Sequence, residues 1–173
     1  SDLGARIIPI VGAPIEHGVL LVHHGRITAV GDANAVRLAA DVQVVDVTGK
    51  VLMPGLVDSH SHIGGGSGGD SSGPIQPEAR VLDGLDVLSP SIQKAQAGGL
   101  TTVNVMPGSG HLISGQTLYL KLRDGRVVDD LLIRLADGSI AGGLKMANGT
   151  NSIRGTPFPG SRAKSAALVC EQF

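Results

Sequence analysis

Residues 51–62 read Val51-Leu52-Met53-Pro54-Gly55-Leu56-Val57-Asp58-Ser59-His60-Ser61-His62. Pro54-Gly55 is a strong turn signal, and the run that follows it predicts a strand. Side chains two residues apart on a strand point to the same face, about 6.6 Å apart along its axis. His60 and His62 can therefore chelate one metal ion at the end of this strand. At this spacing, two surface histidines with no metal remain the alternative.

The chain beyond this strand alternates between strand signals and loop or helix signals. A glycine-rich loop covers residues 64–73. Further along we expect a helix over Pro90–Ala97, strands over Leu100–Met106, Thr117–Leu122 and Ile140–Met146, and a helix over Ser161–Phe173 with Ser161 as its N-cap. This rhythm favours parallel βα units. A complete (β/α)8 barrel needs about 250 residues, so residues 54–173 are expected to supply about half of one, a partial α/β TIM barrel.

The first 53 residues predict a small β module ahead of the barrel. Short apolar runs separated by turn residues indicate strands over Ala5–Ile10, Val19–His23, Arg26–Val30 and Val42–Val47. His24-Gly25 joins two of them as a hairpin turn. We expect these strands to form a small, incomplete β-sandwich over residues 1–53.

Composition excludes several classes of function. The net charge is -1 and the pI is about 6.6, which gives no electrostatic basis for binding nucleic acid or an anionic membrane. Cys170 is the one cysteine, so no disulfide forms within the chain. The sequence shows no leader peptide and no apolar run of about 20 residues, and we therefore expect a cytoplasmic location.

Residues 51–62, together with the Arg26–Gly31 strand ahead of them, closely resemble the signature of the amidohydrolase superfamily. Leu100–Gly108 and Ala141–Ala147 are similar to barrel strands of its imidazolonepropionase-like and dipeptidase-like branch. The resemblance implies a small β-sandwich followed by a metal-bearing TIM barrel. It also implies a hydrolase that uses a metal-activated water to cleave carbon–nitrogen bonds in a small-molecule substrate.

The resemblance also implies roles for individual residues. His60 and His62 would bind a divalent metal, usually zinc, as one or two ions. Lys145 would be carboxylated and bridge two metals, with a strand-end lysine paired to a carboxylate as the alternative. The remaining ligands and the catalytic acid–base aspartate are expected beyond Phe173, because no histidine follows His111.

The sequence leaves open the roles of two further residues and the function of the chain. His111 follows the second barrel strand and is either a substrate-binding residue or a solvated loop histidine. Asp58 either orients an imidazole or is a polar residue at the strand edge. The alternatives to an enzyme are a non-catalytic amidohydrolase-like scaffold and an inactive fragment. A homo-oligomer, or association with a missing C-terminal half, is expected because half a barrel leaves an open sheet edge.

Overall fold

A computed structural model describes residues 4–65 and 69–173 in two compact units, Ser1–Pro54 and Gly55–Phe173. The predicted glycine-rich loop lies partly on residues 66–68, outside the described residues. The boundary between the units falls one residue from the predicted end of the β module. The assignment of the two parts to a sandwich module and a barrel start stays a prediction.

The first unit is built on one four-stranded sheet. Its strands are β1 (Ala5–Ile7), β2 (Ile15–His23), β3 (Arg26–Asp32) and β4 (Val51–Leu52), in the order β3-β2-β1-β4. β2 and β3 form the predicted hairpin, since His23 pairs with Arg26 across the turn. His24 and Gly25 both have positive φ, which is the backbone of a turn that matches the twist of paired strands.

The strand predicted over Val42–Val47 is wrong. These residues form no regular structure, and Val44 and Val45 are 71% and 72% exposed. A β-branched run becomes a strand only where a neighbouring strand pairs with it, and no strand of residues 4–54 does so here. The second sheet that a sandwich requires is likewise absent from residues 4–54.

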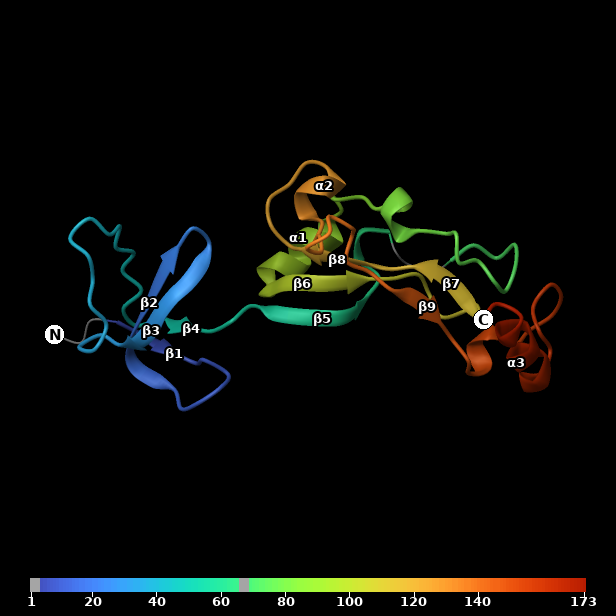
Figure 1. Cartoon of the computed structure of the whole chain (residues 1–173), viewed down its shortest axis with the longest axis horizontal. Coiled ribbons are helices and arrows are strands. Elements are labelled where there is room, and N and C mark those ends of the chain that lie inside the picture. Colours follow the sequence, from blue (N-terminus) through green and yellow to red (C-terminus); the bar gives the residue numbers. More distant parts are fainter. Residues whose placement is uncertain (1–3, 66–68) are drawn as a thin grey trace. The chain divides into compact units, whose positions relative to one another are not determined.

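The second unit begins with a parallel strand–helix–strand segment. β5 (Leu56–Ser61) leads through α1 (Pro90–Ala97) to β6 (Leu100–Val105), and the two strands pair in parallel (Figure 1). Ser89 caps α1 with its side chain, and Pro90 occupies the first turn, where its missing N–H has no partner to lose. Both strand ends therefore reach the same edge of the sheet.

The chain departs from a barrel after β6. β8 (Leu118–Lys121) pairs antiparallel with β6, so the segment 117–122 is not the next parallel strand. Only β7 (Ile113–Gln116) lies between them, and no helix, whereas parallel strands require a long crossover. β9 (Leu144–Met146) pairs antiparallel with β7. Within the described residues, unit 2 thus holds a three-stranded and a two-stranded sheet, and no barrel closes.

The remaining elements of the second unit are short. Helix α2 covers Val128–Leu131. The C-terminal helix α3 (Arg162–Cys170) begins where predicted, since Ser161 Oγ accepts a hydrogen bond from the main-chain N–H of Lys164 at 3.3 Å. Short 3-10 turns occupy Ile63–Gly65, Val81–Gly84 and Thr150–Ser152. No helix in the described ranges is long and apolar enough to cross a bilayer.

The core of the second unit is aliphatic. Ile92 of α1 packs against β6 and β8 within one buried cluster, whose members are Val81, Ile92, Val103, Val105, Leu118, Leu120, Leu122, Leu131 and Leu132. None of these side chains is aromatic, as expected for a chain with 2% aromatic residues. The cluster holds α1 against β6 and β8.

Replacing Ile92 with Ala should lower the free energy of unfolding of the second unit by about 2–5 kcal/mol, because Ile92 is 2% exposed and the change leaves a cavity. Leu88→Ala is the matched control. Leu88 is 62% exposed, so its loss should cost less than about 0.5 kcal/mol. Chemical denaturation followed by circular dichroism measures both. Equal losses for the two variants would contradict this account of the core.

Candidate metal centre

The two predicted metal ligands lie together at the carboxyl end of β5. His60 is in the strand and His62 follows it, and both imidazoles are exposed. Their ring centroids are 5.1 Å apart at an interplanar angle of 83°. Ser61 between them is buried, in agreement with the alternation of side chains along a strand. The arrangement leaves the His60 and His62 rings accessible from solvent.

The His62 ring is oriented by the main chain of the neighbouring strand. Its Nδ1 lies 2.7 Å from the carbonyl oxygen of Met106, the residue that follows β6. A carbonyl only accepts, so Nδ1 carries the proton, and in the neutral ring Nε2 keeps the free lone pair. A hydrogen bond of this kind is the usual partner of a metal-ligating histidine, because it fixes the tautomer. Met106 is a site residue that sequence reasoning missed.

Lys145 of β9 reaches the same place from the other sheet. Its Nζ lies 3.5 Å from Nε2 of His60 and 3.4 Å from Sδ of Met106. No carboxylate of the described residues lies within ion-pair distance of Lys145, so the alternative of a lysine paired with a carboxylate is not found there. The structure thus brings together His60, His62 and Lys145.

The histidine pair fits part of a zinc ligand set. With Zn–N bonds of about 2.0–2.1 Å and tetrahedral angles, two ligating rings have centroids roughly 5.2 Å apart. The 5.1 Å separation of the His60 and His62 rings agrees with this value. A complete site needs at least three protein ligands. The described residues contain no group of three or more His, Cys, Asp or Glu side chains that could hold a metal ion. What the chain offers is therefore an incomplete ligand set.

Two further candidates, Asp58 and His111, make no hydrogen bond to the ring of His60 or His62 within the described residues. The Asp58 carboxylate accepts a hydrogen bond from the main-chain N–H of His60 at 3.0 Å, so it braces the strand end and makes no hydrogen bond to an imidazole. His111 is 4% exposed, which makes the solvated loop histidine wrong. His111 contacts Phe158, at 5.3 Å between ring centroids.

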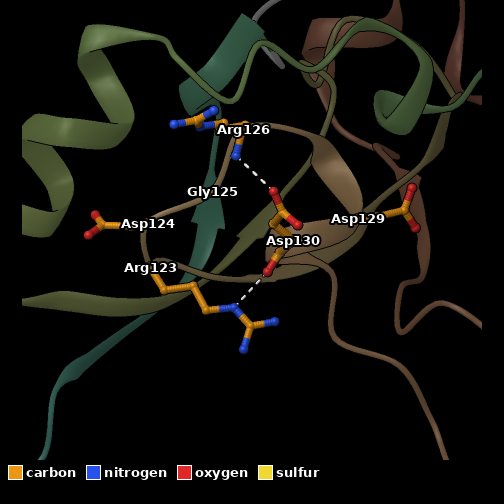
Figure 2. A pocket seen from close by; sticks show the side chains of 6 residues that line it. All are labelled: Arg123, Asp124, Gly125, Arg126, Asp129 and Asp130. Carbon is orange, nitrogen blue, oxygen red and sulfur yellow. Dashed lines mark hydrogen bonds between the residues drawn. The ribbon is translucent and has the colours of Figure 1, made fainter.

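A separate pocket lies between β8 and α2. Its lining residues are Arg123, Asp124, Gly125, Arg126, Asp129 and Asp130. Figure 2 shows Asp130 bonded to its neighbours: its carboxylate accepts from the N–H of Arg126, and its carbonyl accepts from Arg123 Nε. The bonds from the N–H groups of Arg126 and Val127 hold the pKa of Asp130 below its usual value. These polar groups close the loop on itself, which accounts for the pocket without a ligand.

Comparison with known proteins gives relatives of one kind. The chain is 38% identical over 119 residues to amidohydrolase tasK of Hapsidospora irregularis, a match covering 63% of this chain and 12% of that protein. It is 30% identical over 163 residues to imidazolonepropionase of Rhizobium rhizogenes, covering 75% and 40%, respectively. It is 31% identical over 112 residues to enamidase of Eubacterium barkeri, covering 64% and 25%. No family model matches the chain.

A solved structure agrees with these relatives. An amidohydrolase from Thermotoga maritima MSB8 superposes with a TM-score of 0.78 at 31% identity, covering 98% of this chain and 45% of that one. The fold is thus of the amidohydrolase type. The chain belongs to the amidohydrolase superfamily, on its imidazolonepropionase-like side, and spans less than half the length of these relatives.

The tautomer of His62 offers a direct test of this geometry. In metal-free protein near neutral pH, His62 should be predominantly the Nδ1–H tautomer, because the Met106 carbonyl accepts only from that nitrogen. Long-range proton–nitrogen NMR of the ring distinguishes the two forms, with His62→Gln used for assignment. The exposed His17, whose ring makes no hydrogen bond among the described residues, is the internal control and should show both tautomers. A predominantly Nε2–H ring at His62 would contradict the structure.

Proposed function

We propose that this chain contributes the first part of the active site of a metal-dependent hydrolase that cleaves carbon–nitrogen bonds in amides or cyclic amides. The observation that carries the proposal is the cluster of His60, His62 and Lys145 beside the main-chain carbonyl of Met106. Membership of the amidohydrolase superfamily supports the reaction class.

The histidines would bind a metal through unprotonated ring nitrogens. His62 is held with Nε2 free by its bond to Met106. Nε2 of His60 lies 3.5 Å from Nζ of Lys145 and would be free to bind a metal once Lys145 no longer donates to it. These two nitrogens would hold the ion. A divalent ion, most suitably zinc, supplies a more acidic water and polarises a substrate carbonyl when it is bound.

Lys145 would complete the cluster after a chemical change. A protonated amine does not bind a cation. The deprotonated amine adds carbon dioxide and releases a proton, which gives a carbamate with two oxygen donors. Because Nζ lies 3.5 Å from Nε2 of His60, a carbamate formed on Lys145 would place its oxygen ligands beside the metal that the histidines would hold.

The activity belongs to a longer arrangement than residues 1–173. The chain covers 40% of the imidazolonepropionase from R. rhizogenes, and no histidine follows His111. We therefore propose that the other ligands and the acid–base aspartate come from sequence outside this chain, supplied by a C-terminal half with which these residues associate. The alternative, a non-catalytic scaffold, would keep the fold without binding metal.

Zinc binding tests the proposal. Dialysis against zinc followed by elemental mass spectrometry should show bound metal in the unaltered chain, and His60→Ala or His62→Ala should each weaken binding more than roughly tenfold. His17→Ala is the matched control, because His17 lies in the first unit and should not affect affinity. The isolated chain is expected to bind zinc without turnover.

Two results would contradict this proposal. Zinc affinity that is equal in the unaltered chain and in both variants would favour the scaffold. Robust hydrolysis by the 173-residue chain alone would show that the site is complete without further sequence.

The role of Lys145 has a test of its own. With 13C-labelled bicarbonate and zinc present, carbon NMR should show a carbamate signal that Lys145→Met removes. The same variant should lower the metal content, because the shared ligand is lost. Lys121→Met is the control. Lys121 in β8 donates a hydrogen bond to Thr102 Oγ1 in β6, so its loss should leave the carbamate signal and the metal content unchanged. A carbamate signal that persists in Lys145→Met would exclude Lys145 as its source.

A further inference from the structure

Three loops meet beyond the strands that carry the candidate metal centre. They follow β5, β6 and β9. His60 lies in β5, Met106 directly follows β6, and Lys145 lies in β9. Asn151 in the loop after β9 donates to Ser109 Oγ in the loop after β6 at 3.0 Å. A Cβ built at Gly69, in the loop after β5, would lie 2.8 Å from Cε1 of His111. The loops therefore enclose His111.

His111 is a buried polar side chain without a partner. It is 4% exposed, and neither ring nitrogen makes a hydrogen bond within the described residues. An unsatisfied buried donor or acceptor costs about 1–3 kcal/mol, so such groups usually serve a ligand or a functional role. A hydrogen-bonding ligand at His111 would remove this cost.

A cation lies beside this imidazole. The Arg154 guanidinium stacks on the Phe158 ring, with Cζ 3.6 Å from the ring centroid, and His111 packs on the same phenyl group at 5.3 Å. Arg154 Nη1 lies 3.1 Å from the place a Cβ would take at Gly110, the neighbour of His111. Arg154 makes no ion pair with any carboxylate of the described residues. Its charge is therefore available to an anion.

The charges around His111 determine its state. Burial lowers the pKa of His111 and the Arg154 guanidinium lowers it further, while the main chain of Asp70 and then its carboxylate raise it. Near neutral pH His111 is thus neutral, with one N–H donor and one lone pair. Asp70 Oδ1 already accepts from the main-chain N–H of Ser72 at 2.7 Å.

We propose that Arg154 and His111 form a subsite that binds a carboxylate group of the small-molecule substrate. A guanidinium binds a carboxylate through two parallel N–H bonds, and the imidazole N–H adds a third donor. One cation with a carboxylate close by suits a single negative charge and disfavours a phosphate group. The assignment of the ligand as substrate rests on the proposed hydrolase, since the loops follow the strands of that site.

Binding by the metal-free chain tests the subsite without turnover. The probe is N-acetylglycine, and its neutral amide, N-acetylglycinamide, is the matched compound. N-acetylglycine should move the His111 ring resonances in proton–nitrogen NMR and raise the pKa of His111, because an adjacent anion favours the imidazolium. The neutral amide should bind roughly tenfold more weakly or worse and leave that pKa unchanged.

Variants separate the charge of Arg154 from its packing. Arg154→Met keeps an apolar contact with Phe158 and should weaken N-acetylglycine binding roughly tenfold or more. Arg154→Lys keeps the charge and should lose less. Arg37→Met removes an exposed arginine of the first unit and should have no effect. Circular dichroism and amide spectra confirm that each variant is folded.

The outcomes distinguish the subsite from the proposed function. His111 resonances that do not respond to N-acetylglycine, or respond equally to the amide, overturn the subsite, and so does full binding by Arg154→Met. Zinc binding at His60 and His62 is measured on the same protein. Carboxylate binding without zinc binding supports the subsite and overturns the hydrolase, whereas the reverse result overturns the subsite alone.

Discussion

The parallel pairing of β5 with β6 determines where the side chains of the candidate metal centre lie. Parallel strands end at the same edge, and the ladder continues past β6, because the N–H of Met106 donates to the carbonyl of Ser61 at 2.9 Å. The Met106 carbonyl is thereby placed at the His62 ring. A one-residue slip in the pairing would turn the histidines to the opposite face of the sheet. The geometry of the site therefore depends on the register of β5 and β6.

Lys145 depends on a second, separate ladder. It lies opposite Gly115 in the β7–β9 pair, where the register shifts between Ile113 and Gly115. Gly115 has a φ of 121°, and a side chain there would collide with the carbonyl of Ala79. Glycine is therefore required for β7 to pass this close to the loop before it. Nζ of Lys145 lies close to His60 because the β5–β6 pair and the β7–β9 pair end at the same place. A shift in either pair would separate the two side chains.

Local signals were sufficient where an element is defined by its own residues. α1 begins and ends where predicted. Ser89 and Pro90 define its first turn and Gly98 caps its last, and each acts only on residues next to it in the sequence. β5 and β6 follow from apolar runs bounded by turns. The orientation of the segment 117–122 and the absence of a strand over 42–47 depend on which distant segment offers a partner. Residue spacing carries no such information.

The aromatic residues show why the loop cluster escaped sequence reasoning. Phe158 is one of two phenylalanines in the chain, and the main core contains no aromatic side chain. It is nonetheless buried between His111 and Arg154, 47 and 4 residues away along the chain (158 − 111 and 158 − 154). In the sequence, neither a single loop histidine nor a single arginine indicates that it packs against another side chain. Only their packing on one ring makes them a unit. That unit lies in the loops that follow the strands of the histidine pair, so a molecule bound by its acidic end there would have its remaining part within the same group of loops.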